Sequence, residues 1–280
     1  MVRRNLNYHN SKSTLYLVST PIGNLEDITL RAINTLNSVD LIFCEDTRVT
    51  QKLLNHLEIK KKVYSYHEHN KEVQGDFIIE LLIQGKNIAL VSDAGMPIIS
   101  DPGFEVTKLA LENEFNVVPI PGANAALTAL IASGIAPKPF TYYGFLDHKQ
   151  SKKKQQLEEL KEITHTLIFY ESIHRIRKTL EAILDIFGDR DIVIGRELTK
   201  KFEEFTYGKV SEVVNEVENL KGELVLIVSG NDEVKSFELD IKSHIQEFIT
   251  SGETPTNAIK KVAKLRGVTK RDVYNEYHDL

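Results

Sequence analysis

The chain is 280 residues long and carries a net charge of −5, with 41% hydrophobic and 27% charged residues, a composition typical of a globular protein with a sizeable core. Its single cysteine, Cys44, excludes an internal disulfide and any zinc site built from several cysteines. No segment approaches the roughly 20 apolar residues of a membrane-spanning helix. Residues 1–13 form a polar tail without the apolar run of a signal peptide, so we expect a cytoplasmic protein with no membrane association.

From Leu15 to Ser229, short apolar runs alternate with amphipathic stretches, a pattern that predicts α/β layers with largely parallel strand pairing. The predicted strands are Leu15–Ser19, Leu41–Cys44, Ile88–Ser92, Val117–Ile120, Thr166–Tyr170, Ile192–Gly195 and Glu223–Val228. The predicted helices are Leu30–Leu36, Gln51–Leu57, Asp76–Ile83, Phe104–Asn113, Ala125–Ile131, Arg175–Phe187 and Ser211–Leu220.

Changes in composition divide this pattern into domains. Prolines and glycines between Gly122 and the Pro137–Pro139 stretch predict a boundary between an N-terminal α/β domain, residues 14–123, and a C-terminal α/β domain, residues 124–232. After Gly230 the apolar runs stop and a polar linker, Asn231–Glu238, begins. We therefore expect two α/β domains followed by a separate C-terminal segment.

The C-terminal segment, residues 239–280, has the signals of a small helical appendage. Thr254–Pro255 is typical of a helix start, and Thr269 with Asp272 has the spacing of a capping box. Gly267 between the two starts predicts a tight turn, as in a helix-turn-helix unit. Four apolar residues are expected to form its core: Val262, Leu265, Val268 and Val273.

Lysine and arginine gather in three places on this acidic chain. Lys60–Lys62 form one run, Lys149 with Lys152–Lys154 a second, and the segment from Thr254 onward carries six basic residues against three acidic ones. Each run alone is typical of a solvated face. Three runs together on an acidic chain are less easily explained in this way, and they leave open a nucleic-acid partner held by the appendage, with a packing or dimerisation role as the alternative.

Several common catalytic motifs are absent from the sequence, including the G-x-G-x-x-G fingerprint, the phosphate-binding P-loop, the G-x-S-x-G elbow and the H-E-x-x-H helix. His67 and His69 flank Glu68, but an isolated pair of this kind indicates a surface loop, and no metal is expected. What remains is a set of glycine- and proline-rich segments that directly follow predicted strands. Because ligands of α/β sheets sit at the carboxyl ends of strands, these segments predict a pocket rather than plain turns. They are Ser19–Asn24, Ser92–Gly103 and Pro119–Asn124.

The same segments resemble the tetrapyrrole methylase family, whose two-domain α/β fold differs from the common Rossmann type. The resemblance covers residues from about Thr14 to Gly230. The block Cys44–Arg48, with the sequence Cys-Glu-Asp-Thr-Arg, is similar to the branch of the family that acts on RNA and not to the corrin and sirohaem enzymes. The other matching stretches are Leu17–Ile28, Val91–Gly103, Pro121–Asn124, Phe169–Ser172 with His174–Arg175, and Arg196–Lys200.

The resemblance implies an activity and its ligands. It implies transfer of a methyl group from S-adenosyl-L-methionine to the 2'-hydroxyl of a cytidine in the decoding region of 16S rRNA, within the small ribosomal subunit. It also implies a homodimer and places the cofactor in the cleft between the two domains. The residues implied to bind the cofactor are Pro21, Asp93, Ala94, Gly95, Met96, Ile98, Asn124, Ala125 and Tyr170.

Methyl transfer to a hydroxyl depends on alignment of the oxygen, methyl and sulfur atoms, and on removal of the hydroxyl proton. Glu45 or Asp46 is expected to accept this proton, and Arg48 to hold the adjoining phosphate through a bidentate contact. Glu197 and Lys200 are further candidates from the second domain. The identity of the base stays open, since Glu45 and Asp46 also fit a helix N-terminus whose dipole they complement.

Two other functions compete with rRNA methylation. A methylase acting on a tetrapyrrole would need a roomy pocket that is hydrophobic or lined with arginine, and it would not need a basic helical tail. A non-catalytic RNA-binding protein would use the tail alone, and the intact loop Asp93–Gly95 argues against it.

Overall fold

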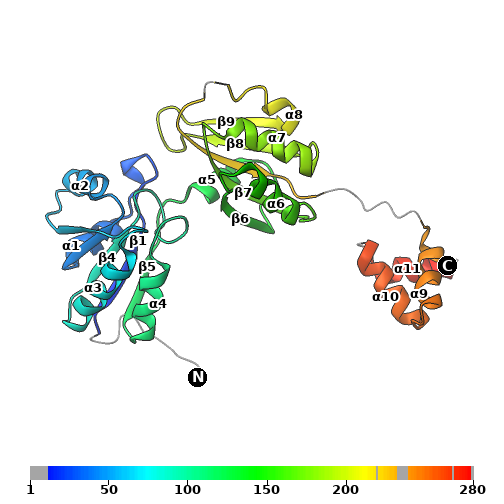
Figure 1. Ribbon diagram of the computed structural model, residues 1–280, viewed down its shortest axis with the longest axis horizontal. Helices are drawn as coiled ribbons and strands as arrows, with labels where there is room; N and C mark the ends of the chain where they lie inside the picture. Colours follow the sequence, from blue (N-terminus) through cyan, green and yellow to red (C-terminus); the bar gives the residue numbers. More distant parts are fainter. Residues whose placement is uncertain (1–11, 219, 232–238, 267, 279–280) are drawn as a thin grey trace. The chain divides into compact units, whose positions relative to one another are not determined.

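The computed structural model describes residues 12–218, 220–231, 239–266 and 268–278. The chain divides into two compact units, residues 1–230 and 231–280 (Figure 1). The first unit contains two five-stranded sheets, and the second is helical. No helix in these described ranges combines the length and the apolar character that crossing a membrane requires.

The first sheet is parallel throughout, with the strand order β3-β2-β4-β1-β5. Helices cover both of its faces: buried residues of α1 and α2 pack on one face, and those of α3 and α4 on the other. The strands are β1 (Thr14–Val18), β2 (Leu41–Cys44), β3 (Lys62–Ser65), β4 (Ile88–Val91) and β5 (Asn116–Ile120). The helices are η1 (Leu25–Asp27), α1 (Leu30–Ser38), α2 (Thr47–His56), α3 (Lys71–Ile83) and α4 (Phe104–Glu112).

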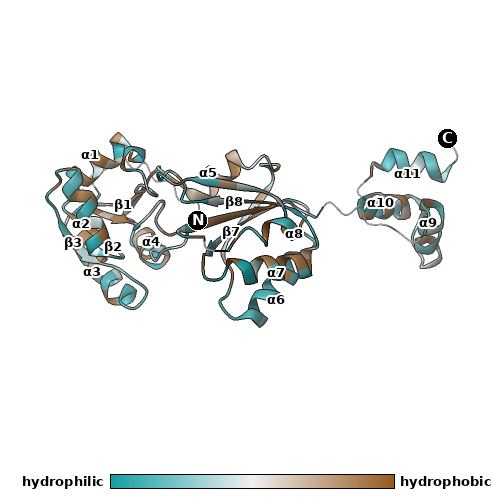
Figure 2. Cartoon of the chain, turned by 90° about the horizontal axis from the view of Figure 1, so that it is seen from above, coloured by the Kyte–Doolittle hydropathy of each residue, from teal (hydrophilic) through white to brown (hydrophobic). Residues whose placement is uncertain are grey.

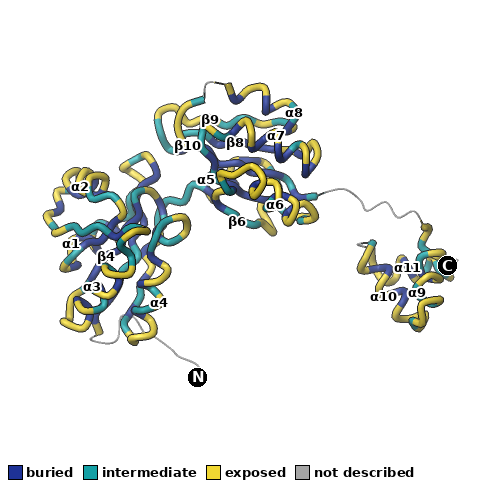
Figure 3. The backbone as a smooth tube through the Cα atoms, in the orientation of Figure 1, coloured by how far each residue is buried: buried dark blue, intermediate teal, exposed yellow. Residues whose placement is uncertain are grey.

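The second sheet has the order β6-β7-β10-β8-β9. Helix α5 packs on one face, and α6, α7 and α8 cover the other. Figure 3 shows buried residues along the strands of both sheets. The strands are β6 (Phe140–Phe145), β7 (Thr166–Ser172), β8 (Asp191–Arg196), β9 (Glu204–Lys209) and β10 (Glu223–Val228). The helices are α5 (Ala125–Ala132), α6 (Gln150–Leu160), α7 (Ile176–Phe187) and α8 (Val210–Val213).

The expected α/β class is confirmed, but the expectation of largely parallel pairing is wrong for the second sheet. Only β6 pairs in parallel there, with β7, whereas β10 runs antiparallel to both β7 and β8, and β9 antiparallel to β8. The connection between β8 and β9, residues 197–203, is too short for the helical crossover that parallel neighbours need. Alternation of strands and helices in the sequence does not reveal this change of direction.

All seven predicted strands are confirmed within one or two residues at each end. The strands that the sequence did not predict are β3, β6 and β9, and each lies at the edge of its sheet. The predicted helix Ser211–Leu220 is wrong from Val214 to Glu218, where turns follow α8, and residue 219 of that prediction lies outside the described residues. Helix α6, in contrast, occupies the segment that appeared only as a lysine run.

The second unit consists of α9 (Ile241–Thr250), α10 (Pro255–Arg266) and α11 (Lys270–Tyr277). The predicted capping box is confirmed, since Asp272 N donates to Thr269 Oγ1 and Thr269 N donates to Asp272 Oδ2. Most residues of α11 are hydrophilic (Figure 2). The predicted turn residue Gly267 lies outside the described residues.

Of the four residues predicted to form the core of this unit, two are buried and two are exposed. Val262 and Val273 are fully buried, whereas Leu265 and Val268 are 45% and 42% exposed. Leu265 lies off the face of α10 that carries the buried residues, and Val268 follows the end of that helix. The core is completed instead by Ile245, Ala258, Ile259 and Ala263.

Candidate active site

A pocket of about 450 Å³ lies in the first unit and is lined by loops from both sheets. On the first sheet, the lining comes from the residues after β1, β2 and β4, and from the start of α5. On the second sheet, it comes from the ends of β6 and β7 and from the start of the neighbouring antiparallel strand β10. The lining residues are Ile22, Glu45, Asp93–Met96, Ile99–Asp101, Asn124, Ala125, Phe145, Tyr170–Ile173, Leu198 and Gly222–Val225.

The loops after β1 and β4 are joined by their backbones. Thr20 N donates to Gly95 O (2.9 Å), and Gly95 N donates to Thr20 O (3.1 Å). Gly95 has a φ of 82°, and a Cβ atom there would lie 3.2 Å from Ile22 Cγ2. Since L side chains rarely adopt this conformation and the space is tight, glycine suits the position and lets the two loops approach.

Three carboxylates lie together on this wall. Glu45 directly follows β2 and is exposed, and partial desolvation, followed by the charges of Asp101 and Asp93, raises its pKa. Burial is also the largest cause of the raised pKa of Asp93, whose Oδ1 accepts a hydrogen bond from Asp46 N (3.0 Å). Ser92 Oγ donates to Asp101 Oδ2 at 2.5 Å. The first wall therefore has a negative potential that favours a cationic ligand.

The second wall is aromatic. Tyr170 has Tyr142 and Phe145 beside its ring, with centroid distances of 5.2 and 5.5 Å. Its hydroxyl accepts a hydrogen bond from Ala126 N (3.2 Å) in the first turn of α5. Burial raises the pKa of Tyr170 well above its usual range, so that the phenol stays protonated. Asn124 caps α5 by accepting from Leu127 N (2.9 Å).

The residues expected to bind the cofactor fall into two groups. Two of them do not line the pocket: Pro21 is buried directly before Ile22, and Ile98 packs against Gly103, with its Cγ1 2.8 Å from where a Cβ on that glycine would lie. The residues that line the pocket are Asp93, Ala94, Gly95, Met96, Asn124, Ala125 and Tyr170.

Of the residues expected to take part in catalysis, Glu45 lines the pocket, whereas Asp46, the N-cap of α2, and Arg48 in the first turn of α2 do not. Asp46 caps this helix by accepting from Arg48 N (2.8 Å), and it also pairs with the Arg48 guanidinium at 2.6 Å. The hydrogen bond from Arg48 lowers the pKa of Asp46 to about 2, which makes this carboxylate a poor proton acceptor. The Arg48 side chain is 86% exposed.

Glu197 and Lys200 form an ion pair at 2.9 Å outside the pocket lining. Lys200 Nζ also lies 2.9 Å from Glu223 Oε2, and Glu223 is a lining residue. The Lys200 stem packs against Gly23 of the loop after β1, where a Cβ atom would lie 2.4 Å from Lys200 Cγ. This pair therefore contacts the rim of the pocket through Glu223.

Sequence reasoning missed several lining residues. Asp101 and Ile99 belong to the segment Ser92–Gly103, which was predicted to form the pocket, but neither residue was predicted to bind the cofactor. Phe145 was missed because the strand that ends with it, β6, was not predicted. The run Phe-Thr-Tyr-Tyr-Gly-Phe is rich in aromatic residues, as strands often are, but its burial does not alternate, so no period-2 pattern marked it as a strand.

Replacing Asp101 with asparagine is expected to lower the pKa of Glu45 and of Asp93, because the Asp101 charge raises both. Carboxyl-carbon NMR titrations of the wild type and of Asp101→Asn would measure these pKa values. Asp185→Asn serves as the control, since Asp185 pairs with Lys154 on the surface and does not line the pocket. An unchanged Glu45 pKa in Asp101→Asn would contradict this account of the site's charge.

Residues 14–214 match the family model described as Tetrapyrrole (Corrin/Porphyrin) Methylases. Because the match covers more than half of the chain, the chain belongs to this family. Similar solved structures agree in fold: a uroporphyrin-III-C-methyltransferase from Thermus thermophilus has a TM-score of 0.58 at 19% identity, over 78% of this chain and 94% of that one. A diphthine synthase has a TM-score of 0.60 at 12% identity, over 78% and 90%.

Two relatives within the family, each matched over nearly its full length, share one name. The chain is 54% identical over 291 residues to ribosomal RNA small subunit methyltransferase I of Bacillus subtilis (strain 168), covering 99% of both chains. It is 45% identical over 272 residues to the protein of that name from Haemophilus influenzae, covering 93% of this chain and 94% of that one. These alignments extend beyond the family model and include the appendage.

Proposed function

We propose that the chain is an S-adenosylmethionine-dependent methyltransferase that modifies 16S rRNA of the small ribosomal subunit at the 2'-hydroxyl of a cytidine. The observation that carries the proposal is the 54% identity over 99% of both chains to a protein named as a small-subunit rRNA methyltransferase. The family match and a pocket of about 450 Å³ at the strand ends support it. We place this activity in the cytoplasm.

The proposed cofactor site uses the pocket's two contrasting walls. S-adenosylmethionine carries a sulfonium and an ammonium group, which suit the wall that holds Asp93, Asp101 and Glu45. The backbone of Ala94 and Gly95 allows close approach, and the aliphatic side chains of Ile22 and Leu198 suit the adenine ring. Among the described residues, no three His, Cys, Asp or Glu side chains are grouped in a way that would hold a metal ion.

The proposed chemistry assigns the base to Glu45. It is the one residue among the five predicted catalytic candidates that lines the pocket, and its raised pKa makes it a stronger proton acceptor than an ordinary glutamate. Arg48, three residues later in the chain, is exposed and would contact the phosphate that adjoins the target ribose. The pair of Glu197 and Lys200 would act at the rim, through Glu223.

A tetrapyrrole substrate suits this pocket less well. The carboxylate side chains of a tetrapyrrole call for arginine or lysine, and the lining contains neither. It contains instead the acidic side chains of Glu45, Asp93, Asp101 and Glu223, while the carboxylate of a further lining residue, Glu171, is 1% exposed and paired elsewhere.

We further propose that the appendage holds RNA. Lys260 and Lys264 are exposed on α10, and Lys270 and Arg271 are exposed on α11. The exposed Tyr274 ring lies beside His278, with 4.3 Å between the ring centroids, and offers a surface on which an unpaired base can stack. Two other cations already have partners within the unit: Lys261 pairs with Glu253, and Arg266 donates to the carbonyl oxygens of Leu239 and Asp240.

A homodimer is also part of the proposal, on the strength of the family resemblance. Leu127 and Ile131 on α5 are exposed apolar side chains, 45% and 82% accessible, of the kind that a dimer interface buries.

Asp93→Asn is expected to weaken binding of S-adenosylmethionine by about 1–3 kcal/mol, since a charged partner is lost while the acceptor for Asp46 N is kept. In the wild type, affinity should fall as pH decreases toward the raised pKa of Asp93, because the carboxylate becomes protonated. This pH dependence should be smaller in the variant. Calorimetry between pH 5 and 8 measures both effects, with Asp76→Asn on the exposed side of α3 as the control. Binding that is unaffected in Asp93→Asn would exclude the assigned contact.

Deletion of the gene is expected to remove one ribose methylation from 16S rRNA, and wild-type expression should restore it. Expression of Arg48→Ala should restore much less, although its cofactor affinity should remain within about twofold of wild type. Arg48→Lys should not substitute fully, because lysine lacks the planar bidentate contact with phosphate. Mapping of 2'-O-methylation along 16S rRNA gives the readout. An unchanged methylation map after deletion would refute the proposed function.

Truncation after Gly230 is expected to leave cofactor affinity near wild type and to weaken RNA binding, because it removes a separate compact unit. The slope of log affinity against log salt should become flatter, since fewer phosphates are contacted. Lys264→Gln with Arg271→Gln in the full chain should flatten it in part, and binding curves at several salt concentrations would show this. An unchanged slope together with a dissociated dimer would favour the packing role instead.

A further inference from the structure

Behind the second wall of the pocket lies a buried lysine. Lys153 of α6 is 1% exposed, although lysine is rarely buried without a partner. Its Nζ donates to Thr179 Oγ1 (2.6 Å) and lies 3.7 Å from Glu171 Oε2. Burial lowers the pKa of Lys153. The sequence placed this lysine in an exposed basic run, and for Lys153 that prediction is wrong.

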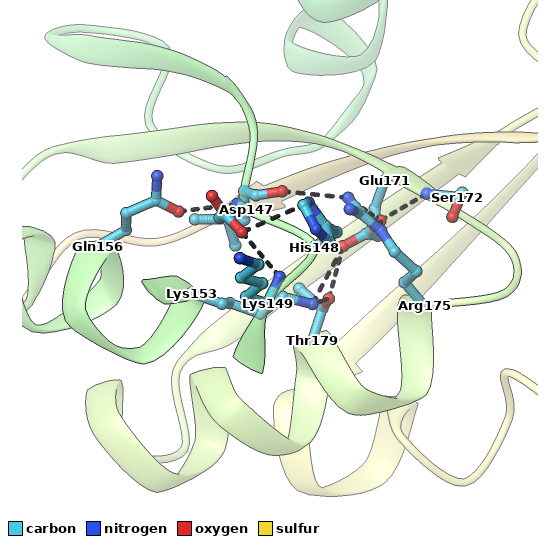
Figure 4. Close-up of polar contacts among 10 residues, drawn as sticks. Asp147, His148, Lys149, Lys153, Gln156, Glu171, Ser172, Arg175 and Thr179 are labelled. Carbon is cyan, nitrogen blue, oxygen red and sulfur yellow. Dashed lines mark hydrogen bonds and ion pairs between the residues drawn. The ribbon is translucent and has the colours of Figure 1, made fainter. Parts of the chain in front are cut away.

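Glu171 of β7 is the central member of a buried cluster, shown in Figure 4. The other members are Lys153, Ser172, Arg175 and Thr179. Glu171 Oε2 accepts from Thr179 Oγ1 (2.5 Å), and its Oε1 accepts from Arg175 Nε (2.7 Å) and from Ser172 N (2.7 Å). Arg175 also donates to Leu146 O (3.3 Å). The two carboxylate oxygens of Glu171 therefore accept hydrogen bonds from three residues, Ser172, Arg175 and Thr179.

The alternation of side chains along β7 directs the Glu171 carboxylate to the face of the sheet that α6 and α7 cover. Side chains in a strand point alternately to the two faces of the sheet. Leu167 and Phe169 of β7 pack with α6 and α7, and Glu171 continues this series, whereas Ile168 and Tyr170 pack on the side of α5. Tyr170, Glu171 and Ser172 are all among the residues that line the pocket, but the Glu171 side chain is only 1% exposed and its carboxylate bonds to residues on the helical side.

The cluster also contacts β6, the other strand that contributes an aromatic side chain to this wall of the pocket. Arg175 joins Glu171 to the carbonyl of Leu146, the residue after Phe145. Phe145 lines the pocket and contacts the Tyr170 ring. The ends of β6 and β7 are therefore held by one set of hydrogen bonds from the helical side of the sheet.

Stability alone does not account for this arrangement. Removing two charges from water is unfavourable, and apolar residues of similar volume often stabilise a core as well as a buried ion pair does. What an ion pair with directed hydrogen bonds adds is a fixed position for the backbone it holds. Here that backbone is Glu171–Ser172, at the edge of the pocket.

We propose that Lys153 and Glu171 are positioning residues for the methyl transfer: they hold Tyr170, Ser172 and Phe145 in the geometry that binds the cofactor. Neither charged group reaches the ligand, since both side chains are buried on the helical side. The inference rests on the proposed function for the identity of the ligand.

The test compares Lys153→Met with Lys154→Met in the full chain. Lys153→Met removes the ammonium and keeps the length, so Glu171 loses a buried partner. Lys154 is the matched control, because it is next in the same helix and pairs with Asp185 on the surface. We expect the dissociation constant for S-adenosylhomocysteine to rise about tenfold in Lys153→Met, with kcat at saturating cofactor changed less than twofold. Lys154→Met should match the wild type in both.

A second variant separates positioning from stability. In Lys153→Met with Glu171→Met, both fully buried charges are gone, and the Arg175 guanidinium that loses Glu171 is 27% exposed, so thermal unfolding should return toward the wild-type temperature. Cofactor affinity should stay low, because Ser172 N has lost its acceptor. Should affinity recover together with stability, or never have fallen in Lys153→Met, the positioning role is refuted. If Lys153→Met does not fold, Thr179→Val tests the same hydrogen bonds with a smaller change, and wild-type affinity in that variant would count against the proposal.

Hydrogen exchange gives a readout that does not depend on the ligand. The Ser172 amide should exchange faster in Lys153→Met than in the wild type or in Lys154→Met, because its acceptor Glu171 is less firmly held. A wild-type chain that binds no S-adenosylhomocysteine would refute the proposed function, while the exchange of Ser172 would still decide whether Lys153 positions this wall. Equal exchange in all three proteins would overturn the inference.

Discussion

The backbone pairing of Thr20 with Gly95 holds together the loops that form the first wall of the pocket. It is possible because β1 and β4 are parallel neighbours, so their carboxyl ends meet at one edge of the sheet. The same edge receives the end of β2, which brings Glu45 to Asp93 although they are far apart in the sequence. The strand order thus concentrates the carboxylates in one place.

Gathering these carboxylates in one place destabilises their ionised forms, but it also favours the binding of a cation. Desolvation and mutual repulsion raise the pKa values of Glu45 and Asp93, which means that their ionised forms are disfavoured in the empty pocket. A cationic ligand relieves this repulsion. Under the proposed function, methyl transfer converts a sulfonium into a neutral thioether, so the acidic wall attracts the methyl donor more strongly than the product. The same charges that favour binding then favour release of the product after transfer.

The sequence predicts the interior of the fold better than its edges. Strands such as β2 and β10 are buried apolar runs and are readily found, whereas β3, β6 and β9 lie at sheet edges and alternate too weakly. Phe145 was missed for this reason. Lys153 was misread for a related one, because three consecutive lysines look alike in sequence while a helix turns only one of them toward the core.

Within the site, family motifs located the loops but not the directions of their side chains. Asp46 and Glu45 are adjacent in the sequence, yet one caps a helix and pairs with Arg48 while the other lines the pocket. Likewise, Met96 lines the pocket, whereas Ile98, two residues later, packs against Gly103. These outcomes depend on backbone turns and on Ile98's positive φ, which residue type alone does not indicate.

An acidic pocket creates a difficulty for an enzyme whose proposed substrate is RNA, because the carboxylates that suit the cofactor repel phosphates. Phosphate contacts supply most of the sequence-independent affinity for nucleic acid. That affinity therefore has to come from cations elsewhere in the chain. The segment from Thr254 onward carries six basic residues against three acidic ones, in a compact unit separate from the sheets. Placing the basic surface on its own unit lets the pocket remain acidic, so that cofactor binding and RNA binding do not compete for the same electrostatic potential.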